Sequence, residues 1–144
     1  MSLVIYTMCV NDIDRVQHMD QESSVYWPRH YFIKSLTSED FHAFIAQVDN
    51  QCVGNIMFRI KKTNLYIDKI VVAMAFRHLG IGGKLLEKAI HIGKTKNAAL
   101  ALLSVSHNNI HAIDFYMKNG FIIEFIQWNH YFNGEHGVRM YRNI

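Results

Sequence analysis

Apolar residues in this chain occur in short runs of strand length, separated by polar turns or by stretches with helical spacing. Runs rich in Val, Ile, Phe and Tyr are typical of strands. They occupy residues 3–10, 41–48, 52–60, 65–72, 98–105, 121–128 and 137–141. The polar residues 49–51 have the length and composition of a hairpin turn. The strands beside this turn and the one that follows are therefore predicted to pair mostly antiparallel.

Helical spacing appears after the glycines in the middle of the chain. Ile81, Leu85 and Ala89 recur on one face, with Gly93 as the predicted end of the helix. A later helix is predicted over residues 110–118, where Asn and Ser precede it and Asn-Gly follows it. These two helices alternate with the predicted strands.

Two more helices are predicted in the first third of the chain. Asn11 or Asp12 is suited to cap a helix that runs toward Met19. The single proline, Pro28, fits the first turn of a second helix that reaches Leu36. The order is one strand, two helices, three strands, helix, strand, helix and two strands, which indicates a mixed α/β protein.

Composition narrows the class of protein. With 144 residues, half of them hydrophobic, the chain suits one core, so residues 1–144 are expected to form one domain. The net charge of +3 is scattered without a basic run, which favours a small anionic ligand over nucleic acid. No apolar run approaches the roughly 20 residues that a membrane-spanning helix needs, so no membrane contact is expected. Cys9 and Cys52 lack disulfide or zinc spacing, and two reduced thiols predict a cytoplasmic location.

A glycine-rich turn lies between the strand at 65–72 and the helix that begins near Ile81. A Walker A loop would need glycine at His78 and Ser or Thr at Leu85, and a dinucleotide fingerprint from Gly80 would need glycine at Leu85. Both nucleotide motifs are therefore excluded. The pattern left is Arg-x-x-Gly-x-Gly at a helix start, where backbone N–H groups can hold a phosphate. The alternative is a connection without a ligand.

Two segments of the chain resemble one enzyme family. The pattern that begins at Arg77 resembles the acyl-CoA pyrophosphate loop of the GNAT N-acetyltransferase superfamily. Residues 109–121 are similar to its Asn-x-x-Ala-x-x-x-Tyr-x-x-x-Gly-Phe signature, and residues 130–141 loosely resemble the last hairpin of the ribosomal-protein alanine acetyltransferase branch. The resemblance implies the GNAT fold, a mixed and mostly antiparallel sheet of about seven strands flanked by about four helices.

The resemblance also implies a donor and its contacts. Acetyl-CoA would give its acetyl group to a primary amine by direct attack in a ternary complex. The strand before the loop would pair with the pantetheine arm, and the loop would hold the pyrophosphate with charge from Arg77 and Lys84. Lys84 is alternatively a solvated helix residue, and Asn109 either bonds the cofactor arm or caps its helix. The expected cofactor-binding residues are Ile70, Val71, Val72, Arg77, His78, Leu79, Gly80, Ile81, Gly82, Gly83, Lys84 and Asn109.

Two residues are expected to carry the chemistry. Tyr116 stands at the family's tyrosine position and would protonate the departing thiolate; the alternative is an aromatic that packs in the core. Asp68 interrupts an apolar strand and would act as the base, because a carboxylate there is costly without a role or a partner. The alternatives are an edge residue paired with Lys69 or Lys61, and a water relay in place of any dedicated base.

The acceptor is the least determined part of the site. Trp27, Tyr31, His130 and Tyr131 are expected near it, and aromatic walls suit a peptide N-terminus, a polyamine, an aminoglycoside or a small metabolite. Similarity to the alanine-acetylating branch favours protein or peptide amines slightly. A metal is not expected, because His107 and its i+4 partner lack a nearby acid. The rival function is a non-catalytic acyl-CoA-binding module, and both a monomer and a homodimer are consistent with the sequence.

Overall fold

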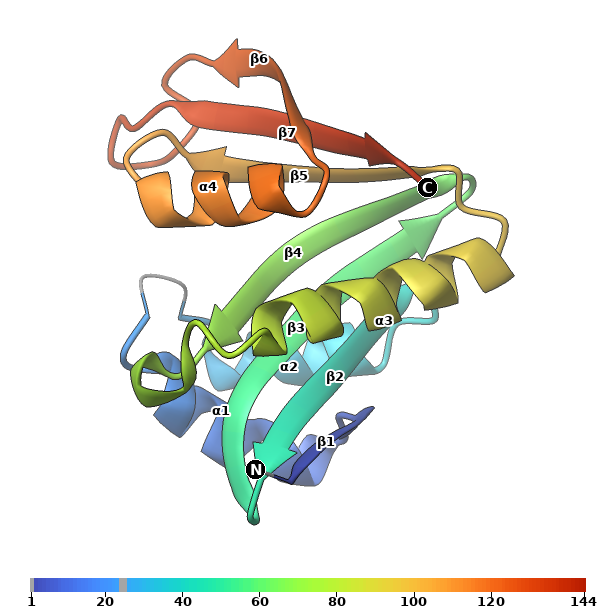
Figure 1. Cartoon of the computed structure of the whole chain (residues 1–144), viewed down its shortest axis with the longest axis vertical. Helices are drawn as coiled ribbons and strands as arrows, with labels where there is room; N and C mark the ends of the chain where they lie inside the picture. Colours follow the sequence, from blue (N-terminus) through green and yellow to red (C-terminus); the bar gives the residue numbers. More distant parts are fainter. Residues whose placement is uncertain (1, 24–25) are drawn as a thin grey trace.

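A mixed sheet with helices on both faces makes up the computed structural model, which describes residues 2–23 and 26–144 (Figure 1). The strands are β1 (Leu3–Thr7), β2 (Phe41–Val48), β3 (Gln51–Lys61), β4 (Asn64–Val72), β5 (Leu100–Ser106), β6 (Ile122–Gln127) and β7 (Gly137–Asn143). The helices are α1 (Ile13–Asp20), α2 (Arg29–Leu36), α3 (Ile81–Thr95) and α4 (Ile110–Lys118), with short 3-10 turns η1 (Val10–Asp12) and η2 (Met74–Phe76). The predicted order of elements is confirmed.

The seven strands pair in the order β1-β2-β3-β4-β5-β7-β6. All neighbours are antiparallel except β4 and β5, which confirms a mixed and mostly antiparallel sheet. Asp49 and Asn50 connect β2 to β3 with φ of 49° and 68°. Positive φ at both positions is the geometry of a two-residue hairpin turn, which Asp and Asn tolerate better than most residues.

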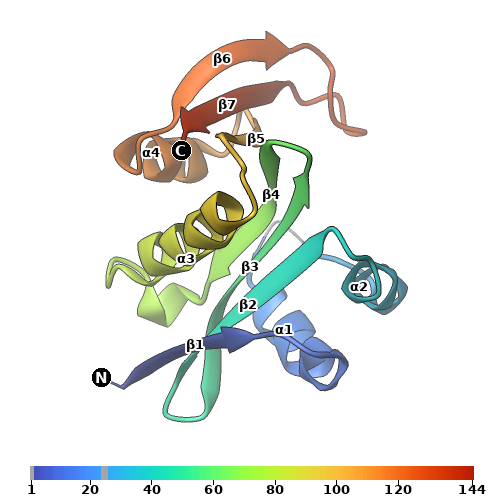
Figure 2. The same cartoon turned by 90° about the vertical axis from the view of Figure 1, so that its right-hand side faces the viewer.

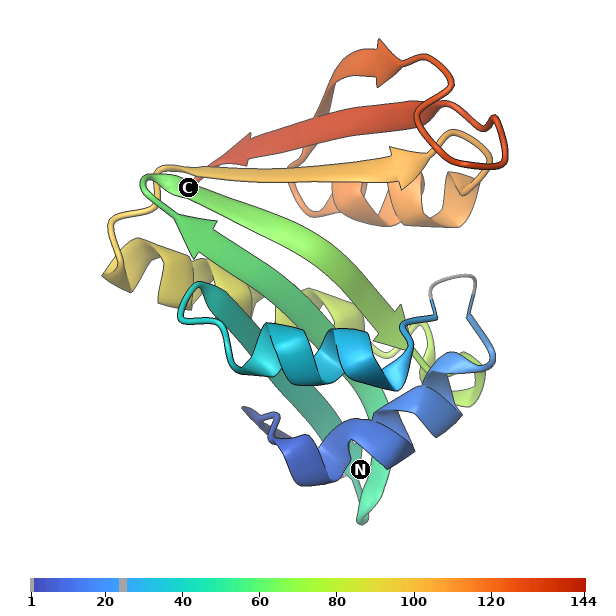
Figure 3. The same cartoon turned by 180° about the vertical axis from the view of Figure 1, so that it is seen from behind.

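The sheet divides between β4 and β5. These strands pair over only three positions, Asn64–Tyr66 with Leu100–Leu102, and then diverge (Figures 1 and 3). Within the described residues, the second half of β4 therefore has β3 on one side and no strand on the other. This gap in the sheet positions the site described below.

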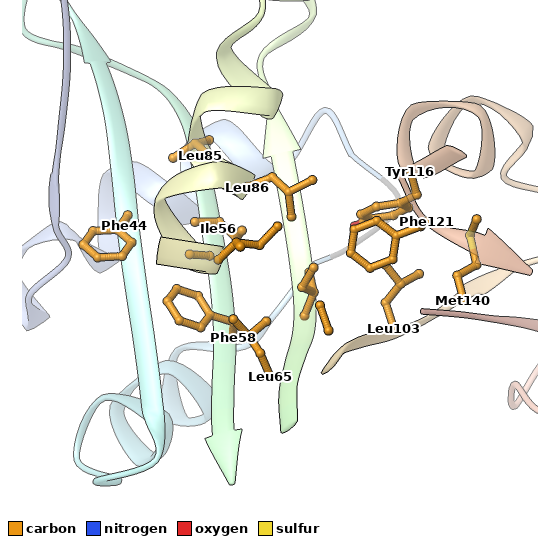
Figure 4. Packing of buried hydrophobic residues seen from close by; sticks show 14 of the residues in the cluster. Phe44, Ile56, Phe58, Leu65, Leu85, Leu86, Leu103, Tyr116, Phe121 and Met140 are labelled. Carbon is orange, nitrogen blue, oxygen red and sulfur yellow. The ribbon is translucent and has the colours of Figure 1, made fainter. Parts of the chain in front are cut away.

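Two apolar clusters cover the two faces of the sheet. On one face, α3 packs against β2, β3 and β4, and α4 extends the same layer over β5 and β7 (Figures 1 and 2). Phe58, Leu65, Leu86 and Tyr116 belong to this cluster (Figure 4). On the opposite face, α1 and α2 bury a second cluster that includes Phe32. Among the described residues, no helix is long and apolar enough to cross a membrane.

Some predicted boundaries are wrong for local reasons. The strand predicted over 3–10 ends at Thr7, because residues from Val10 form η1. Asp12 is the N-cap residue of α1, but its carboxylate accepts a hydrogen bond from the Cys9 N–H at 2.9 Å and makes no side-chain bond to the first turn of α1, so it closes the preceding turn. Gly93 was predicted to end a helix, but α3 continues to Thr95.

The reason for glycine at position 93 is packing. A Cβ there would lie 2.7 Å from Leu65 Cδ1, and Leu65 is fully buried. We expect Gly93→Ala to lower the free energy of unfolding by about 1–2 kcal/mol, because overpacking outweighs the gain of roughly 1 kcal/mol in helix propensity. Urea unfolding measures this change. Gly83→Ala in the same helix is the control, since the nearest atom to its Cβ is 3.5 Å away, and it is expected to be neutral or stabilising. Equal effects at both positions would contradict the packing argument.

Candidate active site

A cavity of about 750 Å³ lies where β4 and β5 diverge. The second half of β4 forms one wall, the turn before α3 forms the end, and α4 forms the opposite wall. Most residues that sequence reasoning assigned to the cofactor line this cavity together with Tyr116. These are Ile70, Val71, Val72, Arg77, His78, Gly80, Ile81, Gly82, Gly83 and Asn109.

Strand β4 directs main-chain groups into the gap. The Ala73 N–H donates to the Val53 carbonyl on β3 at 2.8 Å. Because successive residues of a strand point their main-chain groups to opposite sides, the groups of Val71 face β3 and those of Ile70 and Val72 face the gap. The Val72 carbonyl accepts a hydrogen bond from Arg77 Nε at 3.0 Å. The main-chain groups of Ile70 and the Val72 N–H remain directed toward the cavity.

The turn before α3 forms an anion cradle. Gly80 caps the helix with φ of 83°, a left-handed conformation that glycine adopts without strain. The first-turn N–H groups of Ile81, Gly82 and Gly83 have no preceding helical turn to which they can donate. They lie at the positive end of the helix dipole, and these residues line the cavity. The cradle thus fits a diphosphate, and the free edge of β4 fits an extended amide-bearing arm.

One of these glycines, Gly82, also brings α3 close to α4. A Cβ on Gly82 would lie 3.0 Å from Cε1 of Phe115, whereas one on Gly83 would be at ordinary contact distance, 3.5 Å from Asn119 Oδ1. Asn119 in turn donates from Nδ2 to the Phe115 carbonyl at 2.8 Å. Sequence reasoning considered these glycines only as a phosphate loop or as a connection without a ligand, and it missed the packing of Gly82 against Phe115.

Tyr116 belongs both to the apolar core and to the wall of the cavity. Its ring is buried and packs edge to face against Phe115 and Phe121, with centroids 5.2 and 5.5 Å away (Figure 4). The same residue lines the cavity. Burial raises the pKa of the Tyr116 phenol, so the hydroxyl stays protonated and able to donate. Asn109 caps α4, because its Oδ1 accepts from the Ala112 N–H at 3.2 Å.

Asp68 has a partner that sequence reasoning did not identify. The Arg59 guanidinium on β3 donates to both carboxylate oxygens, with distances of 2.9 to 3.1 Å. This bond raises the pKa of Arg59. The residues that line the cavity do not include Asp68. Lys69, one of the two lysines considered as partners of Asp68, bonds Asp20 and Asn55 instead.

A bulge in β4 explains the direction of Lys69. The register between β3 and β4 shifts after Met57, so Lys69 turns toward the face covered by α1 and α2. There its amine donates to Asp20 and, at 2.7 Å, to Asn55 Oδ1, while Asn55 Nδ2 donates to Asp20 at 3.0 Å. All three residues are buried, and burial lowers the pKa of Lys69 against the opposing effect of Asp20. No spacing in the sequence indicated this network.

The four predicted acceptor residues occur as two separate pairs. The ring of Trp27 lies 4.6 Å from that of Tyr31 and packs on the α2 side of the sheet, and the ring of His130 lies 4.8 Å from that of Tyr131. None of the four lines the cavity. Leu79 and Lys84 are exposed and do not line it either. The cavity therefore collects the predicted donor contacts but not the predicted acceptor contacts.

Hydrogen bonds tie the β6–β7 loop to the start of α4. The half-buried Glu135 carboxylate accepts from Ser106 Oγ at 2.8 Å and from Asn108 Nδ2 at 2.6 Å, and such bonds lower its pKa. His136 Nδ1 accepts from the Asn129 N–H at 2.9 Å. Among the described residues, no group of three or more His, Cys, Asp or Glu side chains is placed to hold a metal ion.

Divergent strands, an anion cradle and a buried phenol in one cavity define an α/β protein that is suited to an extended ligand bearing phosphate. The model of the acetyltransferase (GNAT) family matches residues 11–121 of the chain. The chain belongs to this family. Both the recognition from the loop and helix signatures and the predicted fold are thereby confirmed.

Relatives in this family include enzymes with different acceptors. Streptothricin acetyltransferase A of Bacillus subtilis is 39% identical over 83 residues, which are 56% of this chain and 47% of that protein. The alignment thus spans less than half of that relative. An N-alpha-acetyltransferase of Sulfurisphaera tokodaii is 32% identical over 127 residues, covering 79% of this chain and 76% of that protein.

Solved structures share the fold along the whole chain. The ribosomal-protein-S18-alanine N-acetyltransferase of Escherichia coli superposes with a TM-score of 0.88 and 22% identity, covering 99% of this chain and 94% of that one. A putative streptothricin acetyltransferase of Bacillus anthracis, in complex with acetyl coenzyme A, has a TM-score of 0.86 and 22% identity, covering 99% and 100%.

Proposed function

We propose that this protein is an acetyl-CoA-dependent N-acetyltransferase that acts on a primary amine. The observation that carries the proposal is the free edge of β4 beside the anion cradle at the start of α3 in one cavity. When bound, acetyl-CoA supplies an acetyl group activated as a thioester. The first-turn N–H groups of α3 would bind its pyrophosphate, and Ile70 and Val72 would bond its amide-bearing arm as an added strand.

The transfer reaction also moves a proton from the acceptor nitrogen to the sulfur of the donor. The acceptor amine, with a reference pKa of about 8 for an α-amine or 10.4 for lysine, must lose a proton before or during attack. Tyr116, which burial keeps protonated and which lies in the cavity wall, would donate its phenolic proton to the sulfur as the C–S bond breaks. The proton that the nitrogen loses as the amide bond forms, carried by water, would restore the phenol. Its packing between Phe115 and Phe121 would hold the hydroxyl in a fixed place.

The acceptor is a protein or peptide amine or a small-molecule amine. Named relatives include both an N-alpha-acetyltransferase and a streptothricin acetyltransferase, so the family likeness supports either class. Trp27 and Tyr31 on one side and His130 and Tyr131 on the other are proposed to border the acceptor, outside the donor cavity. Anchoring of the β6–β7 loop by Glu135 would fix the second pair.

Two experiments test the proposal: one measures binding of acetyl donors, and the other measures acetyl transfer to amine acceptors. Calorimetry compares acetyl-CoA with acetyl-pantetheine, which lacks the pyrophosphate; we expect acetyl-CoA to bind at least 10-fold more tightly because of the cradle. Thiol release and mass spectrometry then follow acetyl transfer to peptides with free or blocked α-amines and to small amines such as streptothricin. Tight binding of acetyl-CoA without transfer to any amine would support the binding module instead. No binding of acetyl-CoA would refute the proposal.

Replacing Asp68 distinguishes a structural partner of Arg59 from a catalytic base. Pairing with Arg59 and absence from the cavity wall favour a structural role, so we expect Asp68→Asn to change kcat less than about 5-fold and stability by about 1 kcal/mol. A catalytic base would instead account for roughly 100-fold or more in rate. Steady-state kinetics across about pH 6–10, which covers the titration of an acceptor α-amine, make the distinction. Arg59→Gln is the matched control and is expected to reproduce the small effect.

A further inference from the structure

Two histidine side chains in the wall of the cavity are not used by the fold. His78 lies in the turn before α3, and His111 lies in the first turn of α4. Both residues are exposed. Neither imidazole makes a hydrogen bond or an ion pair within the part of the chain that the structure describes. Both are therefore available to a ligand in the cavity.

The two histidines line the cavity from different sides. His111 and Phe115 are four residues apart on α4, so they share one face of this helix. Phe115 meets the start of α3, because a Cβ on Gly82 would lie 3.0 Å from its Cε1. His111 thus continues the face of α4 that is directed toward the turn. His78 has a φ of 63°, and residues other than glycine that are held in this conformation concentrate at ligand sites.

With both imidazoles neutral, the charged side chains that line the cavity cancel. Among the described residues these are Arg77 and Lys118, which are positive, and Glu22 and Asp114, which are negative. Lys118 is already paired with Asp114 at 2.9 Å, and Arg77 Nε donates to the Val72 carbonyl at 3.0 Å. The cavity therefore offers main-chain N–H groups to an anion, but its side chains add no net positive charge.

The donor of the proposed function is strongly anionic. The pyrophosphate and the phosphate monoester of acetyl-CoA together carry about four negative charges at neutral pH. An anion beside an imidazole favours the imidazolium form, and histidine in model peptides titrates at about pH 6.5. Burial raises the pKa of Tyr116, so this phenol of the wall stays neutral. The two histidines are the groups of the described wall that can gain positive charge when the donor binds.

We propose that His78 and His111 take up protons when acetyl-CoA binds, so that the affinity for the donor rises as the pH falls through the neutral range. The inference rests on the proposed function, because it requires that the cavity binds this donor. Each protonated imidazole adds one positive charge to a wall that otherwise has none to spare. The logarithm of the affinity then changes with pH by the number of protons taken up.

Calorimetry of the full chain at about pH 7.4, in buffers with different ionisation enthalpies, counts these protons. At this pH the phosphates are already almost fully ionised, so the protons belong to the protein. We expect an uptake of about 0.5–1 proton for each acetyl-CoA bound. Acetyl-pantetheine, which lacks the phosphates, is expected to bind without proton uptake.

A variant that combines His78→Asn with His111→Gln removes both imidazoles. Asn is chosen because it tolerates the left-handed backbone at position 78. We expect this double variant to bind acetyl-CoA about 5-fold or more weakly than the wild type near pH 7, but within about 2-fold of it near pH 9, where the wild-type imidazoles are neutral as well. Equal affinity near pH 9 also shows that the site still folds.

His91→Gln is the matched control. His91 is an exposed residue of α3 that does not line the cavity, so proton uptake and affinity are expected to stay unchanged. Tight binding of acetyl-CoA without proton uptake would overturn the inference and leave the proposed function intact. Uptake that persists in the double variant would also overturn it, because other groups would then bind the protons. Absence of acetyl-CoA binding at every pH would overturn both.

Discussion

Replacing Lys69 by Met is expected to lower the free energy of unfolding by about 3–5 kcal/mol. The amine is buried and bonds Asp20 and Asn55, so its loss leaves a buried carboxylate without a counter-charge. The rings of Trp27 and Phe32 lie with their centroids 5.6 Å from the amine, and the side chains of Lys69 and Asp20 are fully buried. Urea unfolding followed by circular dichroism measures the loss.

A second substitution distinguishes an unpaired charge from lost packing. Asp20→Asn combined with Lys69→Met removes both charges and keeps an amide beside Asn55 for hydrogen bonding. We expect the double variant to recover at least half of the stability that Lys69→Met loses, because buried ion pairs are often replaced by neutral groups at little cost. A double variant as unstable as the single one would show that the cost arises from packing around the lysine stem.

Tyr116→Phe is expected to lower kcat by about 10²- to 10⁴-fold, the usual contribution of a positioned general acid. The substitution removes only the hydroxyl, so packing against Phe115 and Phe121 is retained. Affinity for acetyl-CoA, measured by calorimetry, is expected to stay within about 3-fold, since the pyrophosphate and arm contacts lie on other residues. This pattern separates chemistry from binding.

The pH profile gives an independent readout for Tyr116. Because burial raises its pKa, the phenol stays protonated through the neutral and moderately basic range. The wild-type rate is therefore expected to rise with pH as the acceptor amine deprotonates, with no basic limb from Tyr116. Tyr141→Phe, on β7 and outside the cavity wall, is the control and is expected to leave kcat unchanged. Unchanged kcat in Tyr116→Phe would refute the assignment.

The strands and helices were accessible to sequence reasoning because apolar runs of strand length and apolar residues at helical spacing are local patterns. The loop at Gly80 was equally accessible, since a left-handed cap and first-turn glycines are local requirements. Long-range features were not. Gly93 was interpreted as a helix end because its contact with Leu65 depends on how α3 crosses β4. The divergence of β4 from β5 likewise depends on register, which no local pattern specifies.

Within the site, sequence reasoning was closest to the observed geometry for the residues of β4 and of the loop before α3, most of which line the cavity. Main-chain contacts depend on where a strand and a helix start, and these were predicted well. It was weakest for charged side chains on β4, because the bulge after Met57 reverses the face of Lys69. The Lys69 amine therefore pairs with Asp20, which lies far away in the sequence, and the Asp68 carboxylate pairs with Arg59. A strict alternation along the strand predicts neither partner.

The gap between β4 and β5 also sets how the amide protons of β4 exchange with solvent. The Val71 N–H faces β3 and is held in the ladder, so its exchange requires opening of the sheet. The N–H groups of Ile70 and Val72 face the gap, and their exchange requires only solvent access to the cavity. Neighbouring residues on one strand thus differ in protection, and a ligand bonded to the edge of β4 would slow exchange at Ile70 and Val72 while leaving Val71 unchanged.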